Sequence, residues 1–290
     1  MFYGAPSWTA DVSVPSEVAL IEHQAVARDV GKSNLLCPGE ALGDQSSLAF
    51  CSGVLVAPDI VLTAKHCVHR RPCESWFATT AFDGDAAQLP ADQEASCQGI
   101  LDSFEDVAAV RLQASLAAPP TKINLRAVSK DTRVVVAAHP FGTFTKIDND
   151  GRVSPDPIRA GLFRVGADLF QGSSGGGIFD GQGGLLAILS AGPPDGEYDE
   201  TGRCMRLGHD KSLRSLAWSP LPLLTRLCAV SLAPFCPMVV AATPTSPATG
   251  QPADTGRRGW HWSALLLTAG GVAALLGRRL RIGGRRSSRS

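Results

Sequence analysis

Residues 50–68 read FCSGVLVAPDIVLTAKHCV, and this stretch decides the fold. Two apolar runs of strand length lie on either side of a Pro-Asp pair that is typical of a tight turn. The stretch therefore predicts an antiparallel hairpin, and His66 follows directly after its second strand. Cys51 and Cys67 would lie close together across this hairpin, so we expect a disulfide bond that holds the backbone beside His66.

The same pattern of short apolar runs continues along most of the chain. Further runs of strand length, bounded by turn residues, are 107–112, 133–138, 162–165 and 185–190. The regular alternation with helices that a parallel sheet needs is missing. The pattern therefore predicts an all-β domain, a barrel or a sandwich, over about residues 18–233. One helix is indicated within residues 213–230, where Pro220 and Pro222 interrupt it.

A candidate acid opens one of these strands. Residues 104–112 read FEDVAAVRL, and Asp106 stands where the apolar run begins. A partly buried carboxylate is costly unless it is paired, and an imidazole such as that of His66 would satisfy it. Glu105 is expected on the opposite face of the strand, in solvent, and Asp102 in a loop. Asp106 is therefore the preferred partner of a catalytic histidine.

A glycine-rich turn supplies a candidate nucleophile. Residues 170–180 read FQGSSGGGIFD, in which a serine between glycines precedes an apolar pair that resembles the start of a strand. Glycines allow tight turns and bring backbone N–H groups close to a ligand. Ser174 is preferred over Ser173, because only Ser174 has Gly172 two residues before it and a glycine pair after it. The alternative is a flexible Gly/Ser linker.

The composition fits a globular domain without a strong charge signature. Hydrophobic residues make up 44% of the 290 residues, and the formal net charge is +0, so bulk charge gives no argument for a nucleic-acid partner. The eight cysteines are not grouped in CxxC pairs, which favours disulfide bonds and an oxidising compartment over structural zinc. A local His/Cys cluster imitates a metal site: His66, Cys67, His69 and Cys73. We expect neither a metal nor a cofactor. Two further disulfide pairs are compatible with the order of the cysteines: Cys73–Cys97 and Cys204–Cys228.

Together, residues 50–68, 106–112 and 172–179 resemble, in the same order, the three signature blocks of chymotrypsin- and trypsin-like serine proteases. The first block matches the family pattern almost fully, and the resemblance covers about residues 18–233. It implies two six-stranded antiparallel β-barrels with the active site in the cleft between them. It also implies a serine endopeptidase that hydrolyses peptide bonds of protein or peptide substrates through an acyl-enzyme intermediate.

The resemblance assigns a role to each candidate residue. His66 is the general base, Asp106 orients it, and Ser174 is the nucleophile. The backbone N–H groups of Gly172 and Ser174 form the oxyanion hole. Such a set is needed because a serine hydroxyl is a weak nucleophile until a base takes its proton.

The resemblance also points to substrate-binding residues. Ser190 would lie near Asp106, and Gly192 would contact the substrate backbone. Asp168 lies six residues before Ser174, where trypsin-like members keep the acid that binds Arg or Lys. The flanking residues differ from the usual pattern, so a preference for Glu, as in the glutamyl-endopeptidase branch, is the alternative. Asp168 would then be a turn residue.

One departure from the family concerns activation. Digestive-type members carry an aspartate immediately before the nucleophile, which pairs with a new N-terminus after zymogen cleavage. Here that position holds Ser173, and no Ile-Val-Gly-Gly stands near the start. The hypothesis is that the oxyanion hole forms without such a cleavage.

Two other functions are compatible with parts of the sequence. Residues 172–176 could be the Gly-x-Ser-x-Gly elbow of an α/β-hydrolase, with Asp195 and His209 completing the triad. The strand-like residues that follow Ser174 speak against the required strand–turn–helix. The chain could also be an inactive protease homologue that acts as a cell-surface binding module.

The C-terminal region has a different composition. A Pro/Thr/Ala-rich linker is predicted at 234–258, a transmembrane or sorting-signal helix at 259–277, and a basic cytoplasmic tail at 278–290. Trp260 and Trp262 stand where an interfacial aromatic belt would lie. This arrangement also resembles the tripartite sorting signals of bacterial surface proteins, in which case the apolar segment could be cleaved off.

The N-terminal extension, residues 1–17, contains neither a basic n-region nor a sustained apolar run. It therefore predicts no signal peptide, in conflict with the cysteines, and we expect the true start of the protein to lie upstream. The predicted location is extracytoplasmic, at the cell surface or anchored in the membrane by the C-terminal segment, with release after processing as the alternative.

Overall fold

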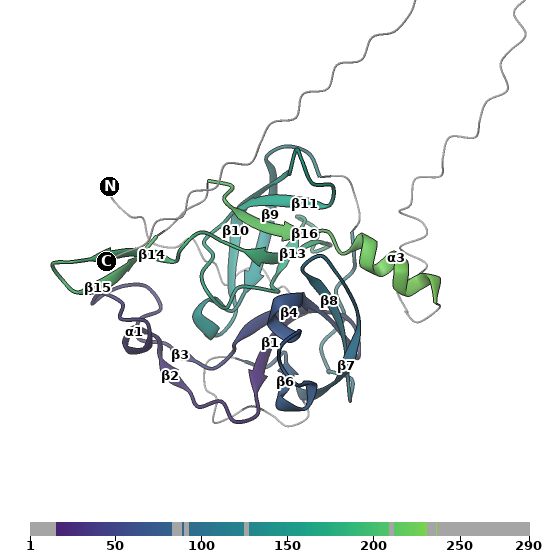
Figure 1. Cartoon of the computed structure of the whole chain (residues 1–290), viewed down its shortest axis with the longest axis horizontal. Helices are drawn as coiled ribbons and strands as arrows, with labels where there is room; N and C mark the ends of the chain where they lie inside the picture. Colours follow the sequence, from purple (N-terminus) through teal and green to yellow (C-terminus); the bar gives the residue numbers. More distant parts are fainter. Residues whose placement is uncertain are drawn as a thin grey trace, which may run out of the picture. The chain divides into compact units, whose positions relative to one another are not determined.

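In a computed structural model that describes residues 16–82, 89, 93–124, 128–208, 212–230 and 236, the chain forms two closed six-stranded barrels (Figure 1). All strand pairs within the barrels are antiparallel, so the predicted double barrel is confirmed. The predicted linker, apolar segment and basic tail fall on residues 234–290, of which only Cys236 is described. Most of the predicted N-terminal extension also lies outside the described residues.

The first barrel contains the predicted hairpin at residues 50–68. The six strands of this barrel follow one another in the order β1 (Glu17–Glu22), β4 (Cys51–Ala57), β5 (Ile60–Ala64), β8 (Val107–Leu112), β7 (Glu94–Phe104) and β6 (Trp76–Thr79). Strand β6 pairs with β1 and closes the ring. Every second side chain of these strands points inward, as the pleat requires, and the interior is filled by Val18, Leu20, Leu55, Val61, Ala108 and Val110.

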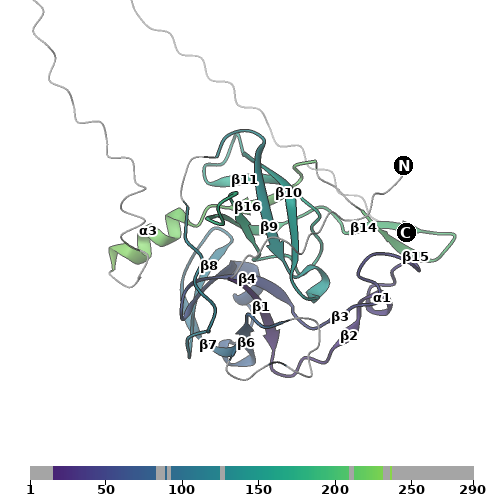
Figure 2. The same cartoon turned by 180° about the vertical axis from the view of Figure 1, so that it is seen from behind.

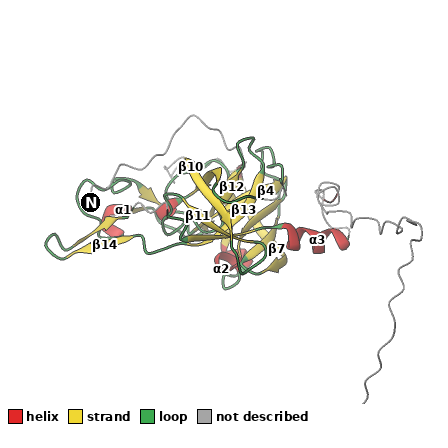
Figure 3. Cartoon of the chain, turned by 90° about the horizontal axis from the view of Figure 1, so that it is seen from above, coloured by secondary structure: helices red, strands yellow, loops and turns green. Residues whose placement is uncertain are grey.

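The second barrel is built in the same way from the following part of the chain. Its order is β10 (Lys146–Pro155), β11 (Leu162–Gly166), β16 (Ser215–Trp218), β13 (Leu185–Ala191), β12 (Gly177–Phe179) and β9 (Thr132–Ala138). Its interior contains mostly β-branched and small apolar side chains: Val134, Val136, Val153, Val165, Ile178 and Ala217. The barrel strands dominate the secondary structure, and the helices are short (Figure 3).

A separate apolar cluster joins the two barrels. Val54 and Leu62 of the first barrel share it with Phe179, Ile188 and Trp218 of the second. Each such fully buried side chain stabilises the fold by roughly 1.5–3 kcal/mol, so the cluster fixes how the barrels meet. The ends of β5, β8 and β13 are thereby held against one another.

The helix predicted within residues 213–230 begins later than expected. Residues Ser215–Trp218 form strand β16, and helix α3 (Leu221–Ala229) starts after Pro220. Pro222 lies in the first turn, where its missing N–H is not needed, so the two prolines start the helix rather than interrupt it. Helix α3 is the longest helix of the described residues, with nine residues. Within that part of the chain, no helix has the length and hydrophobicity that a bilayer span requires.

Small elements surround the barrels. Strands β2 (Arg28–Asp29) and β3 (Ser46–Ser47) pair beside helix α1 (Val30–Ser33). Strands β14 (Gly196–Asp199) and β15 (Cys204–Leu207) form a hairpin that extends away from the second barrel and lies next to α1 in both views (Figures 1 and 2). Three short helical turns complete the described elements: α2 (Lys65–Val68), η1 (Cys73–Ser75) and η4 (Pro140–Gly142).

All eight cysteines are paired. The bonds are Cys37–Cys204, Cys51–Cys67, Cys73–Cys97 and Cys228–Cys236. The pairing of Cys204 with Cys228 that the order of the cysteines allowed is wrong. Strand β15 and helix α3 carry these two residues and lie at opposite ends of the domain (Figure 1). Cys204 instead joins its hairpin to the segment after α1.

Candidate active site

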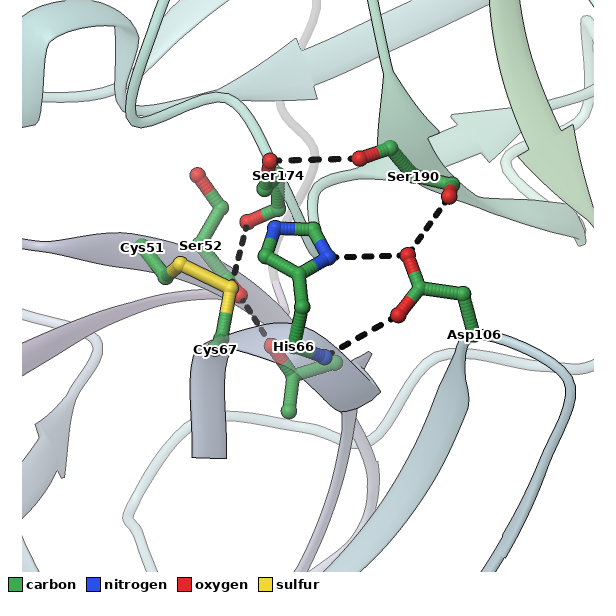
Figure 4. Close-up of polar contacts among 8 residues, drawn as sticks. Cys51, Ser52, His66, Cys67, Asp106, Ser174 and Ser190 are labelled. Atoms are coloured by element: carbon green, nitrogen blue, oxygen red, sulfur yellow. Dashed lines mark hydrogen bonds and ion pairs between the residues drawn. A yellow bond between two sulfur atoms is a disulfide. The ribbon is translucent and has the colours of Figure 1, made fainter. Parts of the chain in front are cut away.

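His66 and Asp106 meet at the end of the first barrel. Strand β5 ends at Ala64 and continues into the short helix α2, which carries His66. Its Nδ1 lies 2.8 Å from Asp106 Oδ2, and its backbone N–H donates to Asp106 Oδ1 at 3.0 Å (Figure 4). The backbone N–H of Lys65 donates to the Asp106 carbonyl at 3.0 Å. Both the position and the ring orientation of His66 are therefore set by Asp106.

Asp106 lies in the turn between β7 and β8, at the boundary with the second barrel. Ser190 of β13 donates its hydroxyl hydrogen to Asp106 Oδ2 at 2.5 Å. Partial burial alone would raise the pKa of Asp106, but the hydrogen bonds from His66 and Ser190 together lower it below its ordinary value. The ionised carboxylate only accepts hydrogen bonds, so Nδ1 of His66 carries the proton and Nε2 is the basic nitrogen.

The two rival acids lie elsewhere. Glu105 is exposed and forms an ion pair with Arg159 at 3.2 Å, as its predicted solvent-facing position implies. Asp102 lies within strand β7 rather than in a loop and pairs with Arg226 at 2.9 Å. The long strand β7 continues to Phe104 because it pairs with β8 up to the turn. Neither acid contacts His66.

The serine turn, defined as residues 170–176, leads into β12 of the second barrel. Gly172 has φ +90° and Gly175 has φ +87°, in the left-handed region that favours glycine. A Cβ atom at Gly172 would lie 2.6 Å from the carbonyl oxygen of His139, so no other residue fits there without displacing the turn. The glycines are therefore required by the backbone geometry and by close packing, and the linker interpretation does not hold.

Ser52 attaches the serine turn to the first barrel. Its backbone N–H donates to the Ser174 carbonyl at 2.8 Å, and its hydroxyl donates to the Gly172 carbonyl at 2.9 Å. The same hydroxyl oxygen accepts the N–H of His139 at 2.9 Å. With both carbonyls held from behind, the peptide planes of the turn have a fixed orientation.

Two backbone donors of the turn have no acceptor among the described residues: the N–H groups of Gly172 and Ser174. The neighbouring N–H groups are used, because Ser173 donates to Phe170, and Gly175 donates to Leu189. The predicted oxyanion donors are therefore the two N–H groups of the turn that are left for a ligand.

Ser174 lies beside the imidazole of His66, which stands between it and Asp106 (Figure 4). Its hydroxyl donates to the Ser190 carbonyl at 3.4 Å, and among the described residues it makes no hydrogen bond with His66. A hydroxyl group turns about one single bond, and catalytic hydrogen bonds are often long before substrate binds. The three side chains thus lie together, and the Ser174 hydroxyl points to the Ser190 carbonyl instead of to His66.

A pocket of about 270 Å³ opens next to Ser174. Ser190 and Gly192, two of the predicted substrate-binding residues, are among the residues that line it. Asp168 does not line it. It is buried, its N–H donates to Asp148 Oδ2 at 2.9 Å, and it faces a separate small cavity shared with Lys146. The chain before the turn places this carboxylate inside the barrel, so the predicted contact between Asp168 and a substrate side chain is not formed.

Buried ionisable groups lie behind the turn. Burial lowers the pKa of His139 to about 4, and its neutral ring donates from Nδ1 to the Thr143 carbonyl at 2.9 Å. Glu17 Oε1 lies 4.0 Å from His139 Nε2, and burial raises the pKa of this carboxyl well above its usual value. Burial also lowers the pKa of Lys146 to about 7. No local sequence pattern predicted this group, because Glu17 lies more than a hundred residues from His139 and Lys146 in the chain.

The His/Cys cluster near His66 cannot bind a metal through sulfur. Cys51 and Cys67 lie near His66, but their sulfur atoms are bonded to each other. Cys73 is bonded to Cys97. A disulfide sulfur carries no thiolate to act as a metal ligand.

The described residues form a double β-barrel, and comparisons with known proteins agree with this fold. Residues 51–188 match the family model described as a trypsin-like peptidase domain. Neuropsin, a serine protease expressed in the limbic system of mouse brain, has a similar structure with a TM-score of 0.52 and 16% identity, covering 78% of this chain and 99% of its own. VesB protease of Vibrio cholerae gives a TM-score of 0.50 and 20% identity, covering 76% of this chain and 66% of its own.

A third solved structure is the active form of the Rv3671c protease from M. tuberculosis. It gives a TM-score of 0.46 and 18% identity, covering 74% of this chain and 80% of its own. No curated protein sequence matches the chain significantly. The resemblance to chymotrypsin- and trypsin-like serine proteases is confirmed by the family model over residues 51–188, and neuropsin shares the fold.

Proposed function

We propose that the protein is a serine endopeptidase in which His66, Asp106 and Ser174 form the catalytic triad. The observation that carries the proposal is that Asp106 and Ser174 lie on two sides of the His66 imidazole (Figure 4). Ser174 also lies in the turn whose two N–H groups have no acceptor among the described residues. These parts come from different barrels. A base, an oriented carboxylate and unpaired N–H donors that meet at one point add little to stability, so this combination indicates a catalytic site.

Each group then has one task in the reaction. His66 Nε2 takes the proton of the Ser174 hydroxyl while the oxygen attacks the carbonyl carbon of the peptide bond. The N–H groups of Gly172 and Ser174 bind the oxyanion of the tetrahedral intermediate, and each such donor lowers the barrier by roughly 3–4 kcal/mol. His66 gives its proton to the leaving amine. Water attacks the resulting acyl-enzyme by the same steps.

Asp106 supports both halves of this cycle. Its carboxylate fixes the tautomer that leaves Nε2 free, and its charge stabilises the imidazolium that forms. The lowered pKa of Asp106 keeps its carboxyl ionised at neutral pH. Ser190 holds the carboxylate from the second barrel and so acts as a positioning residue.

We also propose that the serine turn forms without cleavage of the chain. The bonds from Ser52 to the carbonyls of Gly172 and Ser174 hold the turn, and they need no new N-terminal amine. Ser173 accepts the N–H of Phe170 at 3.3 Å instead of pairing with a cation. Activity of protein whose measured intact mass includes all residues before Val18 would support this proposal, and a strict need for cleavage would overturn it.

The proposed location is outside the cytoplasm, since four disulfide bonds persist only in an oxidising compartment. Anchoring by residues 259–277 and contact with a membrane remain part of the same proposal. Fractionation of cells that express the full chain and a variant ending at residue 244 tests it. Membrane association of the full chain alone is expected, and equal solubility of both would contradict it.

The experiment for the endopeptidase activity uses an unfolded protein such as reduced casein, which offers internal peptide bonds. The full chain should cut it into fragments, Ser174→Ala should not, and Ser173→Ala, the matched control one residue away, should retain cleavage. An inactive binding homologue predicts no cleavage by any variant. The α/β-hydrolase alternative does not fit the fold, because Ser174 is followed by strand β12 rather than by a helix.

A further inference from the structure

The pocket beside Ser174 contains an acidic residue other than the expected Asp168, which lies at a separate cavity. Much of its lining is apolar, from Leu169, Phe170, Leu189, Pro193 and Pro194. Among the described residues that line it, Asp195 is the one charged side chain. A ligand group that enters this pocket therefore meets one carboxylate in largely apolar surroundings.

The two oxygens of Asp195 are used differently. Oδ1 accepts the backbone N–H of Gln171, in the serine turn, at 2.7 Å. Among the described residues, the Gln171 N–H is the partner of this carboxylate, so Oδ2 accepts no hydrogen bond and forms no ion pair there. The first bond limits the rotation of a carboxylate that lines the pocket beside Ser174, and the second oxygen is left for a ligand.

We propose that Asp195 selects a basic side chain, Lys or Arg, on the residue that supplies the carbonyl group of the cut bond. This inference rests on the proposed protease function and names its substrate class. The cationic group pairs with Asp195 Oδ2, while the aliphatic part of the side chain packs against Leu169 and Pro194. The acid is thus supplied by the segment after β13, whereas the aspartate six residues before the nucleophile, Asp168, is buried.

Hydrogen bonds and a disulfide bond of the neighbouring hairpin hold Asp195 in place. The Gly208 N–H donates to its carbonyl at 2.9 Å, and strand β14 begins at the next residue, Gly196. The hairpin β14–β15 is tied to the segment after α1 by Cys37–Cys204 and by the bond from the Leu207 N–H to Glu40 Oε2 at 3.2 Å. A carboxylate on such an anchored hairpin is held in place before the ligand arrives, which favours selective binding.

The surroundings of Asp195 favour a cation over other side chains. Partial burial raises the pKa of this carboxyl, which shows that its ionised form lacks part of its hydration. A basic group supplies the missing partner, a neutral group leaves the charge unpaired, and an acidic group meets a like charge. A preference for Glu, the other specificity that the sequence allowed, is therefore disfavoured.

The test compares peptide substrates that differ only in the residue before the cut bond: Arg, Lys, Leu or Glu. With the full chain, kcat/KM for Arg and Lys should exceed that for Leu by roughly 10- to 100-fold, the loss typical of one charged hydrogen-bond partner. Asp195→Asn should remove most of this ratio and leave the value for Leu within roughly threefold. Glu197→Gln is the control, because it removes one exposed negative charge from strand β14 outside the pocket lining, and it should keep the ratio.

Failure of this inference can be told apart from failure of the protease function. Hydrolysis of p-nitrophenyl acetate with a burst of one equivalent reports on Ser174 and needs no group in the pocket. If the burst is present but wild type shows no preference for Arg and Lys, or Asp195→Asn keeps it, the assignment of Asp195 is overturned. If Asp168→Asn removes the preference while Asp195→Asn does not, Asp168 is the determinant. Absence of the burst in folded protein overturns the protease function itself.

Discussion

The two barrels contribute different kinds of half-sites. In the half from the first barrel, His66 and Asp106 satisfy each other, and both carboxylate oxygens of Asp106 accept hydrogen bonds. In the half from the second barrel, the N–H groups of Gly172 and Ser174 have no acceptor among the described residues. The first half is complete without substrate, whereas the second half leaves groups that a substrate would fill.

This difference explains where the structural support lies. Paired groups such as His66 and Asp106 stabilise each other, but unpaired donors have to be held by their surroundings. The second half accordingly has its support behind it: Ser52 holds two carbonyls, and the buried His139 lies against Gly172. Mutations should therefore act directly in the first half and through backbone geometry in the second.

The largest effect is expected from breaking the first half. Asp106→Asn keeps the shape of the side chain but favours the wrong tautomer of His66, and kcat should fall by roughly 10⁴-fold. Hydrolysis of a peptide ester measures it. Asp102→Asn, which removes a half-buried acid that pairs with Arg226 away from His66, is the control and should stay within roughly twofold. An Asp106→Asn enzyme with more than a tenth of the normal kcat would contradict the role of Asp106.

A smaller effect is expected when the second half is distorted without touching a side chain. Gly172→Ala places a Cβ atom against the His139 carbonyl, shifts an oxyanion donor and should lower kcat by roughly 10²- to 10³-fold. Gly183→Ala is a matched control, because Gly183 also has a positive φ (+78°) but nothing lies within 4 Å of its added Cβ.

Gly183→Ala should cost stability, by about 1 kcal/mol, and leave kcat unchanged. Steady-state kinetics and denaturant unfolding separate the two effects. Equal losses of activity in both variants would show that strain alone, and not the oxyanion geometry, accounts for the result.

The smallest effect is expected from loosening the support of the second half. Ser52→Ala removes the hydroxyl that donates to the Gly172 carbonyl and accepts the His139 N–H, while the backbone bond to Ser174 remains. We expect a loss of about 1–3 kcal/mol in the free energy of unfolding and a fall of roughly tenfold in kcat. Ser75→Ala, whose exposed hydroxyl bonds only to the Pro72 carbonyl, serves as the control. A Ser52→Ala variant with lower stability but normal kcat would limit Ser52 to a structural role.

The sequence predicted the first half of the site better than the second. The hairpin at residues 50–68 and the strand after Asp106 are local patterns, so alternation and turn residues were enough to locate β4, β5 and β8. The charge of Asp106 also required a partner, which pointed to His66. Short stretches of sequence were thus enough to predict these strands and the pairing of Asp106 with His66.

Asp168 and Asp195 show where this reasoning stopped. The spacing of Asp168 from Ser174 matched a family pattern, but spacing does not reveal that the chain turns this carboxylate into the barrel. The position of Asp195 depends on a hairpin held through Cys37 and Glu40, which are more than a hundred residues away in the chain. The pairing of Cys204 failed for the same reason. Contacts of this range follow from the packing of the whole domain.

The most direct test of the account is the identity of the residue that reacts with a fluorophosphonate probe. Incubation of the folded full chain, followed by peptide mass spectrometry, should place one adduct on Ser174. Ser174→Ala should remain unlabelled and Ser173→Ala should be labelled like wild type. No adduct on folded protein, or an adduct on Ser173, would contradict the claim that His66, Asp106 and Ser174 form a working triad.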